Sequence, residues 1–234
     1  MRRLVLLTLL LIQSTFYCVL AQNSTGSSPD VYNAVYRLEL PPGENKIITS
    51  NSQPNLSGSP FLEDWRDGLI IMRSNDTIKT LKLRFDFYNN DMQFMYEGKT
   101  WAIGAKNKIK VIKVGDHSFV YLPYLDNSQI KENYFEALSA GKVSILILYY
   151  PQIKPANYNA ILNTGTKENQ LLLKKKYYFV QDDRVVLMDK KGRNLISANS
   201  QKSKEIKEFI KNNKLSFTEE TDLITIADFV NSLK

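Results

Sequence analysis

A single histidine, His117, is the first residue to consider for chemistry, because a Ser-His-Asp relay would have to pass through it. Asp116 precedes it, but neighbouring residues of a strand point to opposite faces, so this carboxylate cannot orient the ring. The nucleophile motif G-x-S-x-G does not occur in the chain. We therefore predict that His117 is an exposed histidine at the start of a strand, just after a Gly115-Asp116 turn, with no catalytic role.

Carboxylates are the second group that could do chemistry. A glycosidase needs two of them facing each other across a cleft, and no local motif selects such a pair here. The carboxylates available for it are Glu63, Asp64, Asp67, Asp86, Glu97 and Glu136.

Neither a metal nor a cofactor is expected. With one histidine and no cysteine outside the amino end, a zinc site would depend on carboxylates, and no EF-hand spacing is present. Asp182-Asp183 is better explained as a hairpin turn, and Glu219-Glu220 as charge at a helix N-terminus. The third acidic pair is Glu63-Asp64. Ser128 and Lys131 fit S-x-x-K, but the companion motifs of penicillin-recognising enzymes are missing, as is a phosphate-binding glycine loop.

Lysines and tyrosines supply the remaining candidate surfaces. The run Lys174-Lys176 is predicted to lie along a solvated strand edge, where lysine opposes pairing with other chains. The spread of charge, and the absence of any reading motif, argue against nucleic-acid binding. Six tyrosines lie in pairs or near predicted strand ends, and cross-strand packing is favoured for them over stacking on a sugar or a partner. They are Tyr121, Tyr124, Tyr149, Tyr150, Tyr177 and Tyr178.

The amino end has the pattern of a cleavable secretory signal peptide over residues 1–21. Arg2 and Arg3 precede an apolar run that is shorter than a membrane span and is broken by polar residues. Cleavage before Gln22 would remove Cys18, the one cysteine, and leave 29 Lys and Arg against 24 Asp and Glu, a net charge of +5. The mature chain would then have no thiol and no membrane span. The alternative to cleavage is that this segment is retained as a membrane anchor.

Period-two alternation dominates the middle of the chain and predicts antiparallel β structure. Leu81, Leu83, Phe85 and Phe87 alternate with mainly polar residues, and the apolar run 143–150 predicts a strand covered on both faces. A flexible leader with weak strands at 34–40 and 46–49 is expected over 22–60, and a long loop over 151–173. The other predicted strands are 92–96, 100–103, 107–114, 117–122, 133–139, 177–181 and 184–188.

The last 36 residues change to helical periodicity. A helix is predicted over 201–212, and a second one runs to about residue 232 after a capping box made by Ser216 and Glu219. Leu223, Ala227 and Val230 would form its inner stripe. The predicted fold is α+β: a mainly antiparallel meander, sandwich or open barrel of roughly ten strands over 61–198, with a helical hairpin over 199–234 packed on it.

Four stretches of the chain carry a resemblance to known sequences: LKLRFDFYNNDMQFMYEGKTWAI at 81–103, DHSFVYL at 116–122, YFEALSAGKVSILIL at 134–148 and EIKEFIKNNKLSFTEETDLITIADFVNSL at 205–233. In this order they resemble a family of small exported proteins of unknown function found chiefly in Bacteroidetes-type bacteria. The resemblance implies a periplasmic, outer-membrane-associated or extracellular address. It brings no known activity and no catalytic residues.

Three functional hypotheses follow. The sequence favours a non-enzymatic exported protein that binds a protein or envelope partner or has a structural role. A second hypothesis is a carrier of an apolar ligand such as a lipid, held on a concave sheet lined by Leu83, Phe85, Ile145 and Ile147 with the helices as a lid. The third is a hydrolase with a carboxylate pair.

Overall fold

The computed structural model describes residues 56–104 and 106–233. The predicted signal peptide, Cys18 and the weak strands at 34–40 and 46–49 lie outside these residues. Among the described residues, eleven strands form one sheet in the order β1-β10-β9-β8-β7-β6-β2-β3-β4-β5, with β11 paired to β10. The strands are β1 Leu56–Ser57, β2 Arg66–Met72, β3 Thr77–Asp86, β4 Asp91–Tyr96, β5 Lys99–Ala102, β6 Ile109–Val114, β7 His117–Asp126, β8 Gln129–Ala137, β9 Ser144–Lys154, β10 Asn169–Gln181 and β11 Arg184–Leu187.

The sheet consists of two meanders, β2–β5 and β6–β11, joined by antiparallel pairing of β2 with β6. Every pair is antiparallel except β1 with β10, where Leu56 lies beside Asn169. The mainly antiparallel α+β class predicted from the alternation is therefore confirmed. The tight turns use residues that tolerate positive φ, as at Glu97-Gly98 and Asp182-Asp183.

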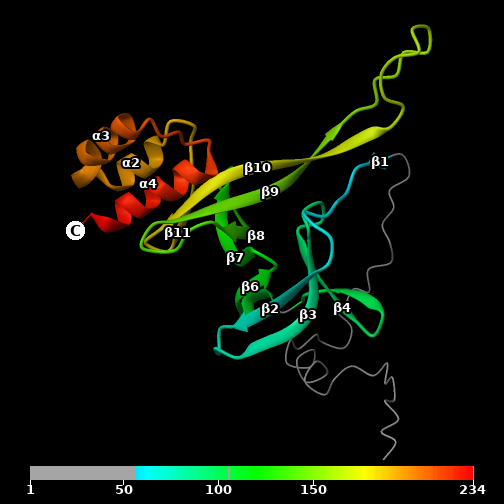
Figure 1. Cartoon of the computed structure of the whole chain (residues 1–234), viewed down its shortest axis with the longest axis horizontal. Helices are drawn as coiled ribbons and strands as arrows, with labels where there is room; N and C mark the ends of the chain where they lie inside the picture. The colour runs from blue at the N-terminus through cyan, green and yellow to red at the C-terminus, as the bar shows by residue number, and fades with distance from the viewer. Residues whose placement is uncertain (1–55, 105, 234) are drawn as a thin grey trace, which may run out of the picture.

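The helices follow the sheet in the chain and gather at the end of β9 and β10 opposite the projecting hairpin (Figure 1). The carboxyl terminus lies beside them. Within the described part of the chain, no helix combines the length and hydrophobicity needed to cross a bilayer. The helical elements are α2 Arg193–Ala198, α3 Ser203–Asn213, α4 Glu220–Ser232 and the 3-10 turns η1 Lys106–Lys108 and η2 Ser200–Lys202.

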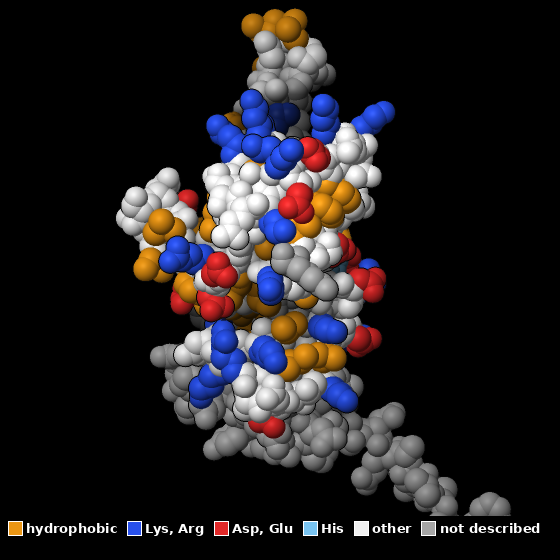
Figure 2. Space-filling view, turned by 90° about the vertical axis from the view of Figure 1, so that its left-hand side faces the viewer, with side chains coloured by type: hydrophobic (Ala, Val, Ile, Leu, Met, Phe, Trp, Pro, Cys, Tyr) orange, Lys and Arg blue, Asp and Glu red, His pale blue; other side chains and the backbone are white. Residues whose placement is uncertain are grey.

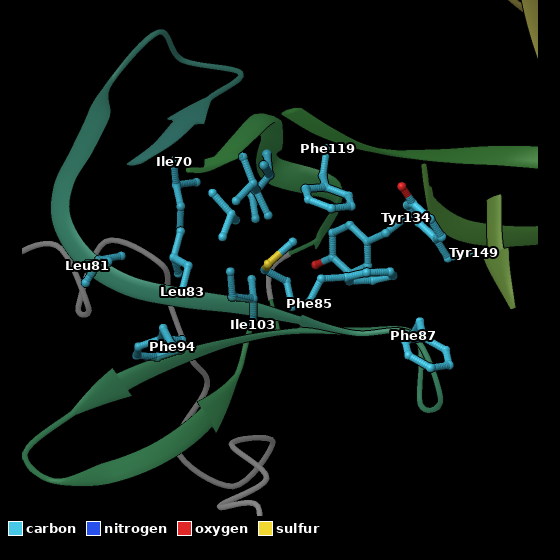
Figure 3. Packing of buried hydrophobic residues seen from close by; sticks show 14 of the residues in the cluster. Ile70, Leu81, Leu83, Phe85, Phe87, Phe94, Ile103, Phe119, Tyr134 and Tyr149 are labelled. Carbon is cyan, nitrogen blue, oxygen red and sulfur yellow. The ribbon is translucent and has the colours of Figure 1, made fainter. Parts of the chain in front are cut away.

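Both faces of the sheet are used to build a core. On one face a large cluster runs from β2 to β10 and includes Phe85, Phe119, Tyr134 and Tyr149 (Figure 3). The ring centroids of Phe85 and Phe119 are 4.9 Å apart. On the opposite face of β7–β10, Tyr124, Phe135, Leu146, Leu148 and Tyr178 form a second cluster.

Strand β9 lies between these clusters, because its residues alternate between them. Ile147 and Tyr149 belong to the larger cluster, and Leu146 and Leu148 to the smaller one. This confirms the prediction of a strand covered on both faces. It also accounts for the near absence of polar residues over 143–150, since neither face of this stretch meets water.

Helices α3 and α4 pack through a third cluster, which includes Val143 just before β9, Ile145 of β9 and Phe179 of β10. Ile206 of α3 and Leu223, Ile226, Ala227 and Val230 of α4 are buried there, so the predicted inner stripe is correct. The rings of Phe209 and Phe229 stack at 3.8 Å and join the two helices directly.

Several sequence predictions need correction. The loop predicted over 151–173 is confined to the residues between Lys154 and Asn169, because β9 and β10 continue to pair as far as Lys154 with Gln170. Pro151 is accepted inside β9 because β8 pairs with β9 only at Ile147 and Leu146, which leaves β9 with a free edge at the proline. Three elements were not predicted: strand β2, helix α2 and the short strand β1, which lies in the flexible leader predicted over 22–60.

The predicted capping box is also wrong. Glu219 is the N-cap of α4, but its side chain makes no capping hydrogen bond. The main-chain N–H of Ser216 donates to Asp222 Oδ2 at 2.8 Å, and the Ser216 hydroxyl lies 2.8 Å from that of Thr218. Asp222, in the first turn of α4, therefore takes the role that the motif assigned to Glu219.

Candidate functional site

His117 lies between two carboxylates, and the prediction that it is an exposed histidine without partners is wrong. Its Nδ1 lies 2.6 Å from Glu136 Oε1 and its Nε2 lies 3.3 Å from Glu63 Oε1. The side chain is 25 % exposed. The sequence hid this because the first carboxylate comes from β8 and the second from the segment before β2, far from His117 along the chain.

Strand register brings His117 and Glu136 together. In the β7–β8 pair Phe119 lies opposite Glu136, so His117, two residues earlier, is on the same face and diagonal to Glu136. In the β8–β9 pair Glu136 lies opposite Ile147, which places Tyr149 on that face as well. The Tyr149 hydroxyl donates to Glu136 Oε2. His117, Glu136 and Tyr149 therefore form a polar row across three adjacent strands, and together with Glu63 we call it the buried row.

Glu63 reaches the row from the segment that crosses the end of β3. The Leu62 N–H donates to the Phe85 carbonyl at 3.0 Å, and the Phe87 N–H donates to the Pro60 carbonyl at 3.0 Å. These main-chain bonds hold Glu63 over the imidazole. Its second carboxylate oxygen accepts a hydrogen bond from Arg66 Nε at 3.0 Å.

The ionisation of the cluster follows from these contacts. Burial by itself would lower the pKa of His117, but the hydrogen bonds and charges of Glu136 and Glu63 outweigh it and raise that pKa. The hydrogen bond from Arg66, followed by the one from His117, lowers the pKa of Glu63. Burial, and then the hydrogen bond to Glu136, raises the pKa of Tyr149, so its hydroxyl stays protonated. The arrangement favours a protonated imidazolium between two carboxylates.

This geometry does not suit a catalytic relay. Both ring nitrogens of His117 already face carboxylates, so neither is left to take a proton from a serine. Glu63 and Glu136 lie on opposite ring nitrogens, and the ring itself occupies the space that a glycosidic bond and its water would need.

The cavity beside the histidine is small. Its volume is about 10 Å³, close to the least that one water molecule needs. It is lined by Leu62, Glu63, Asp64, Arg84, Phe85, Val114, His117 and Phe119. The cavity therefore has room for about one water molecule beside the imidazole.

A second polar arrangement, centred on Arg84, lies next to the first and was not predicted. Its guanidinium carbon is 3.5 Å from the ring centre of Phe61 and 4.2 Å from that of Trp65. Arg84 Nε donates to Gln93 Oε1 at 2.8 Å, and Gln93 Nε2 donates to the buried Asp86 at 3.1 Å. Asp86, one of the six carboxylates considered for a hydrolase pair, also accepts the main-chain N–H groups of Tyr88 and Asn89.

The other candidate carboxylates are dispersed over the surface. Asp67 pairs with Lys82 at 2.9 Å, Asp64 accepts the N–H of Trp65 at 2.8 Å, and Glu97 occupies the β4–β5 turn. Among residues 56–104 and 106–233, no group of three or more potential ligands could hold a metal ion.

The remaining motifs are also accounted for. Ser128 is in the β7–β8 turn, while the Lys131 ammonium pairs with Asp126 at 2.6 Å instead. Asp182 and Asp183 form the β10–β11 hairpin turn, as predicted. Glu220 begins α4 and accepts hydrogen bonds from Lys175 at 2.6 Å and Tyr177 at 3.1 Å.

The lysine run and the tyrosines follow their predictions. Lys174, Lys175 and Lys176 are exposed on β10. Between β1 and β11, no described strand pairs with the edge of β10 that faces away from β9, so the run lies along a strand edge. Tyr124 and Tyr178 are buried edge-to-face with centroids 5.6 Å apart. Cross-strand packing, rather than exposure, therefore describes these two rings.

One exposed apolar site escaped the sequence analysis. Ile161 and Leu162 are 94 % and 67 % exposed, and they lie in the loop between β9 and β10. The signal in the sequence was an Ile-Leu pair inside a polar segment rich in asparagine.

We compared the chain with protein-family models, with curated proteins and with solved structures, and none of the three comparisons found a match.

Proposed function

We propose that this protein is an exported, non-enzymatic binding protein of the cell envelope or its surroundings, and that the β9–β10 hairpin is its binding element. The observation that carries the proposal is the contrast between two parts of the molecule. The titratable groups of the buried row form hydrogen bonds with one another. The hairpin projects beyond the rest of the sheet (Figure 1), and its end carries the exposed apolar side chains of Ile161 and Leu162.

The buried row supports a structural role. His117 joins the segment before β2 to strands β7 and β8, and Tyr149 extends the link to β9. Hydrogen-bonded ion pairs of this kind fix the relative placement of the elements they join. Because each reactive atom already has a partner from the same chain, the row supports binding or structure over turnover.

Burial also favours this proposal over a carrier of apolar ligands. Leu83, Phe85, Ile145 and Ile147, which a carrier would present to its ligand, are all fully buried side chains of the core. Ile145 packs under α4 and the other three pack within the large cluster. The helices cover a filled core there. Exposed large apolar side chains occur instead on the hairpin, at Ile153, Ile161 and Leu162, and on other strands, at Leu125, Ile130 and Leu187.

The proposed export from the cytoplasm is supported by the pattern of residues 1–21 and by the family resemblance. A positive start, an apolar run and a small residue before Gln22 support cleavage during export. Fractionation followed by mass spectrometry of the amino terminus tests this. We expect the exported chain to begin at Gln22, and recovery of the chain starting at Met1 from the cytosol would overturn the proposal.

The binding element is tested by shortening the hairpin. Replacing residues 156–168 by Asn-Gly keeps the pairing of Lys154 with Gln170 and closes the strands with a favoured two-residue turn. We expect the wild-type chain to sediment with envelope fractions and the shortened chain to remain in the supernatant with unchanged circular dichroism. His117→Gln, made in the full-length hairpin, is the matched control. Loss of sedimentation in His117→Gln, with retention in the shortened chain, would overturn the proposal.

A further inference from the structure

The loop at the end of the β9–β10 hairpin presents its two largest apolar side chains to solvent. Ile161 is 94 % exposed and Leu162 is 67 % exposed, although each is a residue type that is usually buried. Figure 1 shows the hairpin extending well beyond the rest of the sheet, and Figure 2 shows hydrophobic side chains at its far end. Tyr158 on the same loop is also exposed.

The loop is held by its own hydrogen bonds. Asn159 Oδ1 accepts the main-chain N–H of both Ile161 and Leu162, at 3.0 and 3.1 Å. Asn159 and Thr164 exchange two main-chain hydrogen bonds at 2.8 and 3.3 Å. The Tyr158 hydroxyl donates to Asn163 Oδ1 at 2.8 Å. The two apolar residues are thus presented on a defined turn, and their own main-chain N–H groups already have an acceptor.

Positive charge accompanies the apolar end. Between residues 151 and 176 the hairpin has five lysines and one acidic residue, Glu168. Lys154 and Lys167 lie nearest the loop, and both are exposed. Lys174–Lys176 follow along the same strand towards the body.

We propose that this loop docks the protein on an anionic lipid bilayer, with Ile161 and Leu162 entering the boundary between headgroups and acyl chains. The proposal rests on the proposed function and names the target of the hairpin. Lys154 and Lys167 then lie against the lipid phosphates.

Two observations favour a lipid surface over a protein partner. A stable protein–protein interface buries about 800 Å² on each partner, whereas two side chains on a narrow projecting turn offer far less. Transfer into an apolar medium also demands that main-chain N–H groups be satisfied within the chain, and Asn159 does this for the two residues at the apex.

The test is sedimentation of the full chain with vesicles. We expect binding to vesicles of mixed phosphatidylglycerol and phosphatidylcholine, weakening with salt, and little binding to vesicles of phosphatidylcholine alone. The double variant Ile161→Ser with Leu162→Ser should bind the mixed vesicles at least about tenfold more weakly. Lys154→Gln with Lys167→Gln should lose about fivefold for each lysine. Leu187→Ser, at an exposed residue of β11, is the control and should bind as wild type.

A direct readout comes from Leu162→Trp, whose fluorescence should shift to the blue on mixed vesicles and stay unchanged on phosphatidylcholine alone. Equal binding of the wild type to both vesicles, or unchanged binding of the apex double variant, would overturn the inference. If shortening the hairpin abolishes sedimentation with envelope fractions while mixed vesicles are not bound, the target is a protein. The lipid inference then fails and the proposed function stands.

Discussion

The side-chain amide of Asn231 pairs with both main-chain groups of Val143. Its Nδ2 donates to the Val143 carbonyl at 2.8 Å, and its Oδ1 accepts the Val143 N–H at 2.8 Å. Val143 is buried just before β9, where no neighbouring strand provides these bonds. Asn231, in the last turn of α4, thereby replaces the hydrogen bonds that a neighbouring strand would make, and it links α4 to the start of β9.

Asn231→Leu should lower the free energy of unfolding by about 2 to 3 kcal/mol, because it leaves a buried donor and a buried acceptor unpaired. Urea denaturation measures the change. Asn213→Leu is the matched control: its Nδ2 donates to the Phe209 carbonyl at an exposed helix end, so its cost should be much smaller. Equal costs for the two variants would show that the Asn231 pairing adds no stability.

The stability of the protein should fall as the pH rises through the pKa of His117. Because the pKa of His117 is raised in the folded state, its protonated ring stabilises the fold. This stabilisation is complete at pH values below the pKa of the unfolded chain, about 6.5. The contribution is lost once the pH exceeds the folded value. Urea midpoints between about pH 5 and pH 9 should show this decline in the wild type and lose it in His117→Gln.

Nuclear magnetic resonance gives a direct check, because the chain has one histidine and therefore one imidazole titration. The midpoint should lie above the usual histidine value, and Glu136→Gln should bring it down by removing the nearer carboxylate. A midpoint at or below the usual value would contradict the arrangement of the buried row.

Gly192→Ala should destabilise the protein by about 2 to 4 kcal/mol. Gly192 has φ +62° and precedes α2, and a Cβ there would lie 2.1 Å from Phe217 Cζ. Gly98→Ala is the control, since its φ is +70° but nothing lies within 4 Å of the added carbon. It should cost only about 1 kcal/mol, the cost of the left-handed conformation. Thermal melts of both variants separate the clash from the backbone strain.

Replacing Lys174 and Lys176 by valine should promote association between chains. Both lie on the free edge of β10, and their loss joins apolar residues 171–173 to 177–180 with one charge between them. Light scattering during incubation should rise for this double variant. The control is Lys110→Val with Lys113→Val in β6, a strand that pairs with β2 and β7. Its light scattering should not rise. Aggregation of both variants alike would point to lost charge rather than to the edge.

The local pattern of apolar and polar residues predicted the strands and helices that have one face towards the core and one towards solvent. Phe85 alternates with polar neighbours and Leu223 recurs with a helical period, so both were assigned to the correct element. Strand β2 was missed because Leu69–Met72 is a continuous apolar run without alternation. Pro151 was taken as a break, although the free edge of β9 accepts it.

The buried row could not be predicted, because it depends on register. Glu63, His117, Glu136 and Tyr149 come from four separate segments, and a shift of one residue in either strand pair would turn Glu136 or Tyr149 to the other face. Each of the four residues appeared in the sequence analysis, but nothing local joined them. The capping error at Ser216 has the same origin, since Asp222 competes with Glu219 for the same role.

The order of strands has a consequence for how the chain folds. From β6 to β11 each strand pairs with the next along the chain, and the same holds from β2 to β5. Hairpins of this kind close short loops, so the chain loses little conformational entropy before the stabilising contacts between the strands form. Among the strands within residues 56–104 and 106–233, only the β2–β6 and β1–β10 pairs join distant segments. We therefore expect two independent folding nuclei, in which pairing spreads from the turns, and we expect β1 to be added last.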